Sequence, residues 1–324
     1  MNKSAEKNSV IMMVDALNLF TRHFVAHPAV STNGTHVGGV VGFLYNVLDL
    51  TERFRPTEIV IAWEGGGSTR RRGIYADYKS KRRPQKLNRF YENDIPNTVE
   101  NRNDQVSLIV EILSHLPVKQ IYVADCEADD VIGYLSKYKY RGSRKLIVSS
   151  DKDYYQLLDR DTIIYSPTWK KLVTLKEVIE KFDVSPENFC LAKAVCGDPA
   201  DNIGGVKGVG FKTISKRFPM MKEQTSVEIS DLVNHANLMI SEGSKIKAYE
   251  NVIKSESTIR RNWKLIYLDT QNLSGTQIKK INDIIETFDT QRNKMEVMKI
   301  LIREGIQTFN VDRFFLAISK VGAQ

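Results

Sequence analysis

Cysteine is scarce in this sequence, and long apolar runs are absent. The three cysteines in 324 residues are odd in number and none has C-x-x-C spacing, so neither a disulfide framework nor a zinc knuckle is predicted. No apolar run approaches the roughly 20 residues that a membrane-spanning helix needs. The start, residues 1–9, is short and polar and lacks an apolar signal region. We therefore expect an intracellular globular protein with no membrane partner and with plain buried thiols.

Internal repeats and low-complexity segments are also absent, and the remaining composition is that of an ordinary globular protein. The hydrophobic content of 42% is enough for a core of one large domain or two smaller ones. The net charge of +8 is notable, because any clustering of the acids leaves the rest of the surface more basic still. Such a basic surface suits the binding of a polyanion, because its cations can hold the phosphates of that polyanion. A protein that is basic only for solubility is the alternative.

Short apolar runs of the β type alternate with amphipathic helical patterns up to about residue 185. This alternation predicts an α/β fold with a doubly wound, mainly parallel sheet. From residue 186 onward the pattern is helical, so we expect an α/β domain at 1–185 and a helical domain at 186–324. The predicted strands are residues 10–14, 58–63, 119–124 and 144–149, with 163–165 as a further candidate, and the main helical patterns are 36–50, 103–116 and 131–140.

Acidic residues follow the ends of the four predicted strands. Parallel strands bring their carboxyl ends to one edge of the sheet, where so many like charges would cost several kcal/mol without a cation. Hard divalent ions prefer carboxylate oxygens, and this many carboxylates suggests two ions about 4 Å apart, as in phosphodiester cleavage. The alternatives are acidic helix starts favoured by the helix dipole, or acids on loops that never meet. The residues are Asp15, Glu64, Glu127, Asp129, Asp130, Asp151 and Asp153.

A glycine-rich run lies in the helical part, at residues 204–210. It would turn backbone N–H groups outward at a helix start and so form an anion cradle for a DNA phosphate. Its spacing does not fit a P-loop, and the alternative is an ordinary turn between two helices. The residues concerned are Gly205, Lys207, Gly208 and Gly210, followed by Lys212 and Thr213.

The most basic stretch of the chain, residues 70–86, interleaves cations with Tyr75 and Tyr78. It has few aliphatic side chains, so we expect a mobile excursion outside the core. The tyrosines could stack on unpaired bases, and a solvated basic loop is the alternative reading. The cations are Arg70, Arg71, Arg72, Lys79, Lys81, Arg82, Arg83 and Lys86.

Three ordered motifs resemble the flap endonucleases and 5′-3′ exonucleases, a family that includes phage enzymes and the 5′-nuclease domain of bacterial DNA polymerase I. The resemblance runs from about residue 10 to about residue 218. Asp15 resembles the family's first-strand aspartate, and Tyr75-x-x-Tyr78-Lys79-x-x-Arg82, preceded by Arg71, resembles its basic helical gateway. The chain departs from the family at Trp63-Glu64, where Phe-Asp is usual. The three motifs are Glu127-Ala128-Asp129-Asp130, then Ser150-Asp151-Lys152-Asp153 with Gln156-Leu157, then Gly197-Asp198-x-x-Asp201-Asn202-Ile203-x-Gly205-Val206-x-Gly208-Val209-Gly210.

The resemblance implies a two-metal site for Mg²⁺, with Mn²⁺ as a substitute. One ion would be held by Asp15, Glu64, Glu127 and Asp129, and the second mainly by Asp151, Asp153 and Asp201. Asp130 and Asp198 would bind the second ion directly or through water. Lys79, Arg82 and Arg71 would contact the scissile phosphate. Residues 65–105 would form an arch over a 5′ single strand, and the glycine turn would be a helix-hairpin-helix type element that grips duplex phosphates and a K⁺ ion. The further DNA contacts would be Arg70, Arg72, Tyr75, Tyr78, Lys81 and Arg83.

The function implied is that of a metal-dependent 5′ nuclease, a 5′-3′ exonuclease and flap endonuclease acting in replication or primer removal. Its substrates would be DNA with a 5′ flap, nick or 5′ end, and RNA/DNA hybrids. We expect a monomer in the cytoplasm, or in the host cytoplasm if a phage encodes it, and the lack of an attached polymerase domain favours a free-standing, phage-like enzyme. Two alternatives stay open at this point: a non-catalytic branched-DNA binding protein and a PIN-like single-strand ribonuclease. Residues beyond 231 show no obvious chemistry.

Overall fold

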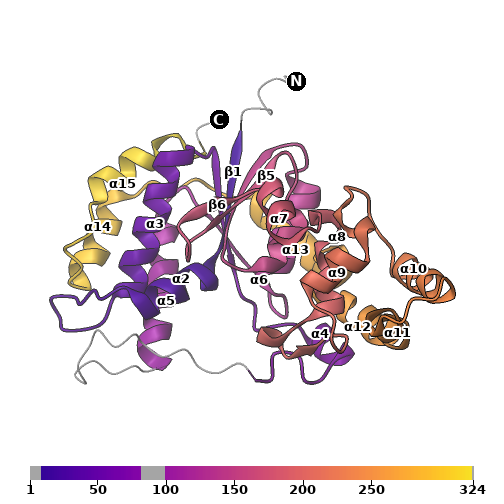
Figure 1. The fold of residues 1–324 in the computed structure, drawn as a ribbon. Coiled ribbons are helices and arrows are strands. Elements are labelled where there is room, and N and C mark those ends of the chain that lie inside the picture. The colour runs from indigo at the N-terminus through magenta and orange to yellow at the C-terminus, as the bar shows by residue number, and fades with distance from the viewer. Residues whose placement is uncertain (1–8, 82–98, 323–324) are drawn as a thin grey trace.

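A six-stranded sheet forms the centre of the protein in a computed structural model that describes residues 9–81 and 99–322 (Figure 1). The strand order is β3-β2-β1-β4-β5-β6, and all neighbours are parallel except β5 and β6. The predicted doubly wound, mainly parallel sheet is confirmed, and the further candidate strand is β5. The bounds are β1 Val10–Asp15, β2 Glu58–Trp63, β3 Lys119–Tyr122, β4 Arg144–Val148, β5 Thr162–Ser166 and β6 Lys171–Val173.

Helices cover both faces of this sheet because successive strand residues point to opposite sides. Met12 and Val14 of β1 pack against one layer, and Ile11 and Met13 pack against the other. The first layer holds α2 Ala16–Ala26, α3 Gly38–Phe54 and α5 Val99–Ser114. The second holds α6 Ala128–Tyr134, its π-helical extension Leu135–Lys139, the 3₁₀ helix η2 Lys152–Leu157 and α7 Leu175–Phe182.

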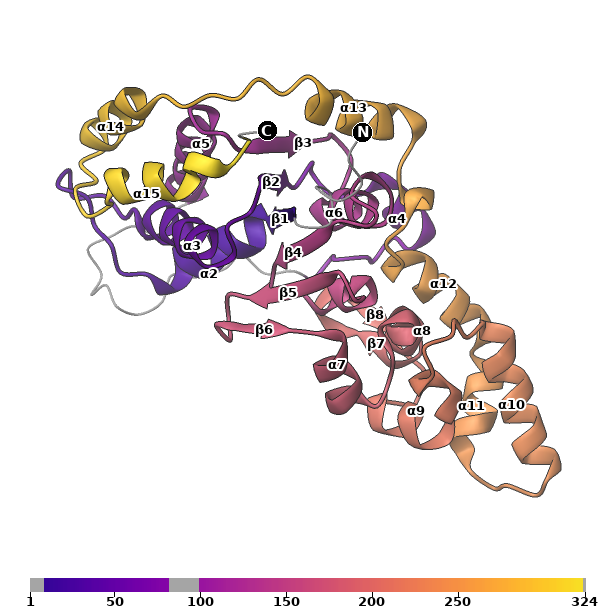
Figure 2. The same ribbon diagram turned by 90° about the horizontal axis from the view of Figure 1, so that it is seen from above.

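The helical part of the chain extends away from the sheet in Figure 2 and then returns to it. It extends as α8 Pro186–Cys196, α9 Phe211–Arg217, α10 Ile229–Ser241 and α11 Lys247–Lys254. It returns as α12 Glu256–Ile266, which packs on α8, and α13 Gly275–Glu286 beside β3, then α14 Lys294–Arg303 and α15 Val311–Ala317, whose buried residues share a core with α3 and α5. The short elements are α4 Thr69–Ile74, β7 Gly197–Asp198, β8 Ile203–Gly204 and the 3₁₀ turns Pro199–Asp201, Pro219–Lys222, Thr270–Asn272 and Ile318–Lys320.

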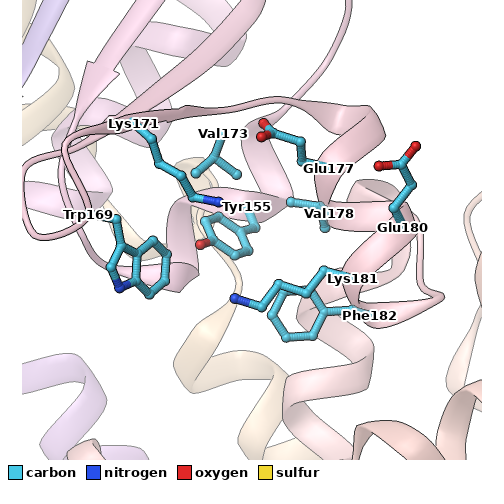
Figure 3. Close-up of a pocket in the computed structure, with 9 residues that line it drawn as sticks. All are labelled: Tyr155, Trp169, Lys171, Val173, Glu177, Val178, Glu180, Lys181 and Phe182. Carbon is cyan, nitrogen blue, oxygen red and sulfur yellow. The ribbon is translucent and has the colours of Figure 1, made fainter.

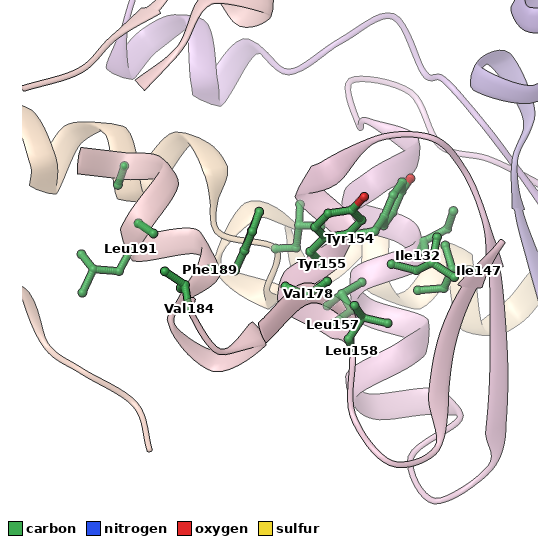
Figure 4. Packing of buried hydrophobic residues seen from close by; sticks show 14 of the residues in the cluster. Ile132, Ile147, Tyr154, Tyr155, Leu157, Leu158, Val178, Val184, Phe189 and Leu191 are labelled. Carbon is green, nitrogen blue, oxygen red and sulfur yellow. The ribbon is translucent and has the colours of Figure 1, made fainter. Parts of the chain in front are cut away.

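One hydrophobic cluster crosses the predicted boundary at residue 185. Tyr155 of η2 packs edge to face on Phe189 of α8, with ring centroids 5.2 Å apart. Figure 4 shows these two rings in the same cluster as Ile147 of β4. This packing joins the helical part to η2, the element that carries Asp153. The domain boundary at residue 185 stays a prediction.

The described part of the basic stretch, residues 70–81, is not the excursion outside the core that its composition predicted. Residues 69–74 form α4, and Arg71 is 1% exposed and Tyr78 6% exposed. Both side chains can be buried because they bond to buried acids, and these bonds offset the cost of removing polar groups from water. Composition alone does not reveal such partners. Arg82, Arg83 and Lys86 lie outside the described residues, as does much of the predicted arch. Among the helices of the described ranges, none is long and apolar enough to cross a bilayer.

Candidate metal centre

The acids that follow β1, β2 and β4 meet at the carboxyl edge of the sheet, as predicted. Asp15 ends β1, and the parallel register pairs it with Ala62, two residues before Glu64. Its Oδ2 accepts hydrogen bonds from Ser149 Oγ and Tyr154 Oη, each at 3.2 Å. Burial, together with repulsion from Asp151 and Glu64, raises the pKa of Asp15 to about 7. A nearby cation would stabilise the ionised form of such a carboxylate.

Glu127, Asp129 and Asp130, at the start of α6, form what we call the first carboxylate group. One oxygen from each lies within 4.8 Å of the others. Three acids can crowd here because Arg71 and Lys79 face them: Arg71 Nη1 is 3.0 Å and Lys79 Nζ 2.7 Å from Glu127 Oε2. Burial favours the neutral acid, but these two charges outweigh it and lower the pKa of Glu127. Burial raises the pKa of Asp129.

Asp153, Asp198 and Asp201 form the second carboxylate group, again with one oxygen each within 4.8 Å. Lys193 of α8 lies between two of them, bonded to Asp153 and 2.7 Å from Asp198 Oδ2. Burial, and after it the repulsion of Asp151 and Asp198, raises the pKa of Asp153 to about 7 in spite of Lys193. Asp198 therefore lies with Asp153 and Asp201, the ligands assigned to the second ion, and whether it binds the ion directly or through water stays a prediction.

Tyr78 and Lys79 connect the two carboxylate groups. The Tyr78 hydroxyl is 2.9 Å from Glu127 Oε2 and 3.5 Å from Asp201 Oδ2. The Lys79 N–H donates to the Asp201 carbonyl at 2.9 Å, from a left-handed backbone conformation with φ of 57°. A non-glycine residue held in this region is strained, and such strain is common at functional sites. The buried Tyr78 ring is not the exposed stacking surface that the sequence suggested.

Arg71 also has a different role from the predicted contact with the scissile phosphate. Its guanidinium is bidentate to Asp130, with Nη1 at 2.5 Å and Nη2 at 2.7 Å from the two carboxylate oxygens. Its Nε donates to the Leu265 carbonyl at 2.8 Å. With these bonds made and only 1% exposure, the guanidinium is committed to protein groups, so it compensates the buried acids.

The other predicted DNA contacts lie around this centre with different degrees of exposure. Arg70, Arg72, Lys81, Lys207 and Lys212 are exposed. The Tyr75 ring is covered by the guanidinium of Arg261, 4.4 Å from its centroid. In the glycine turn, which includes Gly205, Gly208 has φ of +72° and Gly210 precedes α9, so the predicted turn at a helix start is present, and Thr213 lies in the first turn of α9. Whether any of these residues contacts DNA stays a prediction.

The donor set fits divalent ions. Glu127 Oε1 and Asp129 Oδ1 are buried and have no hydrogen-bond partner within the described ranges. An orphaned buried carboxylate oxygen is costly unless a cation binds it. All the converging ligand atoms are carboxylate oxygens, which hard ions such as Mg²⁺ prefer. The residues therefore fit the predicted metals better than they fit an ordinary hydrogen-bonded core.

Sequence reasoning missed Lys193 and Asn272, both of which bond to acids of the centre. Lys193 is the one cation in the apolar run of α8, 7% exposed, and a charged residue at a core position was a usable signal. Asn272 donates to Asp130 Oδ1 at 3.1 Å from a segment with no motif. No local pattern could have identified Asn272, because its partner is 142 residues away in sequence.

A separate hollow of about 320 Å³ has Tyr155 among its lining residues. Figure 3 shows Trp169 and Lys181 in its lining, with Glu177 and Glu180 along α7, and the Lys181 ammonium lies 4.8 Å from the centroid of the Trp169 ring. The hollow contains no member of either carboxylate group. We therefore do not assign it to the metal centre.

Known proteins resemble this chain in both sequence and fold. Residues 10–183, more than half of the chain, match the family model of the 5′-3′ exonuclease N-terminal, resolvase-like domain. This chain belongs to the 5′-3′ exonuclease family. A 5′-3′ exonuclease of Aquifex aeolicus is 32% identical over 220 residues, which cover 67% of this chain and 71% of the relative. DNA polymerase I of Bacillus subtilis is 28% identical over 84% of this chain, but only 30% of the polymerase is covered.

Solved structures support the same fold for this family member. The flap endonuclease of bacteriophage T5, in a complex with DNA and metal ions, has a TM-score of 0.67 at 20% identity, covering 86% of this chain and 98% of that one. Flap endonuclease-1 of Methanococcus jannaschii has a TM-score of 0.53 at 17% identity, covering 99% and 93%. At these identities the likeness shows the fold, and the chemistry must be argued from this chain's own residues.

Proposed function

We propose that this protein is a divalent-metal-dependent 5′ nuclease that hydrolyses DNA at 5′ flaps, nicks and 5′ ends. The observation that carries the proposal is the pair of carboxylate groups at one sheet edge, joined by Tyr78 and Lys79 and flanked by exposed cations. The family supports it, because similar proteins are named 5′-3′ exonuclease and flap endonuclease. RNA annealed to DNA is proposed as a further substrate, and the working form as a monomer.

Two Mg²⁺ ions, replaceable by Mn²⁺, are proposed at the two carboxylate groups. Asp15, Glu64, Glu127 and Asp129 would hold one ion, and Asp151, Asp153, Asp198 and Asp201 the other. Asp130 would act indirectly, because Arg71 and Asn272 already bond to its oxygens. When bound, such ions lower the pKa of a coordinated water and offset the charge of the phosphate. Relatives with bound metal ions, one of them with zinc, support this proposal.

Lys79 is the residue proposed to act on the reacting phosphate. Its Nζ is paired with Glu127, and its side chain is 18% exposed, so the ammonium group lies at the metal centre and is open to solvent there. A cation at this position stabilises charge that builds on the phosphate oxygens in the transition state. Arg82 is proposed to assist it.

The exposed cations and the glycine turn are proposed to hold the rest of the substrate. Lys207 and Lys212 are exposed on both sides of Gly208 and Gly210, and backbone N–H groups before α9 suit a duplex phosphate. A K⁺ ion is proposed at this turn. Arg70, Arg72 and Lys81 would contribute contacts that weaken as salt rises, because each releases counterions from the DNA.

Cleavage of a 5′-labelled flap by Asp153→Asn and Asp201→Asn variants tests the proposal. We expect product from the wild type with Mg²⁺ and none with a chelator, and a loss of at least about 100-fold in rate for both variants. Asp161→Asn, an exposed acid at the opposite edge of the sheet, is the matched control and should cleave normally. Wild-type activity in chelator, or normal cleavage by both variants, would contradict the proposal.

The same assay separates the two alternative functions. A branched-DNA binding protein would bind the flap without cleaving it, and its affinity would be indifferent to chelator. A single-strand ribonuclease would cleave RNA and would not respond to substitution of Gly208 and Gly210, whereas the proposed nuclease should lose duplex affinity.

A further inference from the structure

Residues 265–272, which we call the C-terminal brace, contact the first carboxylate group from the end of α12. Asn272 is 8% exposed, and its Nδ2 donates to Asp130 Oδ1 at 3.1 Å and to the Tyr267 carbonyl at 2.6 Å. The amide is thus fixed by the brace itself and presents one donor to Asp130. A buried amide with both N–H groups used in this way has a defined orientation.

Asp130 transmits this contact to Glu127 through Arg71. The Asp130 carboxylate lies between Asn272 and the bidentate guanidinium of Arg71, whose Nη1 also bonds to Glu127. The brace fixes the other end of the guanidinium, because the Leu265 carbonyl accepts from Arg71 Nε. Both ends of the brace therefore determine where Arg71, and with it Glu127, can lie.

The brace also contacts the element that carries the second carboxylate group. The Gln156 side chain, in η2, donates from Nε2 to the Asp153 carbonyl at 2.8 Å and to the Ile266 carbonyl at 3.0 Å. Its Oε1 accepts from the Leu268 N–H at 2.9 Å. A single segment of eight residues is thus hydrogen-bonded to the supports of both groups.

We propose that the C-terminal brace sets the spacing of the two carboxylate groups, with Asn272 and Gln156 as positioning residues for the metal centre. The inference rests on the proposed function, since it concerns the metals of that site. Tyr78 and Lys79 already join the two groups, and a segment that is bonded to the supports of both restricts their spacing further. Partners that orient metal ligands typically change metal affinity by 10- to 100-fold when removed, although they touch no ion.

Manganese binding to DNA-free protein, followed by the electron paramagnetic resonance of free Mn²⁺, tests this directly. We expect Asn272→Ala and Gln156→Ala to weaken Mn²⁺ binding about 10-fold or more. In cleavage assays, the Mg²⁺ concentration for half-maximal rate should rise by a similar factor, while the rate at saturating Mg²⁺ recovers to near the wild-type value. A variant that was merely less stable would not show this separation.

Asn282→Ala is the matched control. Asn282 lies in α13, in the same C-terminal part, and bonds to Tyr134 of α6 at 2.9 Å rather than to a carboxylate of the centre. It should keep Mn²⁺ affinity within twofold of the wild type, and melting in chelator compares the stability of all the variants. Should Asn272→Ala fail to fold, Asn272→Ser, which supplies a shorter hydroxyl donor in place of the amide, replaces it and should bind Mn²⁺ more weakly than the wild type.

The outcomes distinguish this inference from the proposed function. If Asn272→Ala keeps Mn²⁺ affinity within twofold of the wild type, or if Asn282→Ala loses as much Mn²⁺ affinity as Asn272→Ala, the proposed role of the brace is wrong and the proposed function is unaffected. A wild-type protein that binds no Mn²⁺ overturns both.

Discussion

Replacing Arg71 by methionine should destabilise the metal-free protein more than any surface substitution. Methionine removes the charge, so Asp130, Glu127 and the Leu265 carbonyl each lose the bonds that Arg71 donates. Arg71 and Asp130 side chains are each 1% exposed and Glu127 is 2% exposed, so solvent cannot replace the guanidinium. Breaking a buried ion pair on one side costs about 3–5 kcal/mol of unfolding free energy, and we expect a loss of that size.

Urea denaturation in chelator measures this loss, with Arg72→Met as the control. Arg72 is the next residue and its side chain is 50% exposed, so its replacement should change the unfolding free energy by about 0.5 kcal/mol or less. Adding Asp130→Asn to Arg71→Met should recover about 1–3 kcal/mol, because the buried charge left behind is then neutral. A loss below about 1 kcal/mol for Arg71→Met, or no recovery in the double variant, would refute the compensation argument.

Three further predictions concern the remaining parts of the site. The pKa of Asp15 is raised from 3.8 to about 7 in the folded, metal-free protein, so its contribution to stability is present below pH 4 and is lost as pH rises to about 7. In chelator, the unfolding free energy of the wild type relative to Asp15→Asn should therefore fall between these pH values, and a difference that does not change with pH would contradict this. Lys79→Ala should slow cleavage at saturating substrate about 100-fold or more while DNA affinity changes little, and equal losses in both would make it a residue that only positions DNA. Gly208→Ala should destabilise the protein by about 1 kcal/mol, because φ is +72° there, and should weaken duplex binding in a salt titration; unchanged affinity would remove the turn from the DNA interface.

The parts of the fold that could be predicted are those set by local sequence. The strands β1 and β4 are short apolar runs with acids at or soon after their ends, and strands separated by helices pair in parallel, so Asp15 and Asp151 had to reach the same edge. The antiparallel edge strand β6 was missed because three residues carry too little periodicity.

The parts that could not be predicted depend on partners far apart in sequence. Composition marks Arg71 as one of a run of surface cations, and only the position of Asp130 and Leu265 makes it a buried one. Asn272 has no motif around it and gains its role from Asp130. Lys193 is intermediate between these cases, since its apolar helix hinted at burial but not at its two acidic partners.

Mapping the cleavage products of one 5′-flap substrate, with Mg²⁺ and with chelator, decides whether this protein is a metal-dependent 5′ nuclease. We expect products shortened from the 5′ side, with 5′-phosphate and 3′-hydroxyl ends, formed only with Mg²⁺ and absent for Asp153→Asn. Binding of the flap with no products under Mg²⁺, or the same products in chelator, would contradict it.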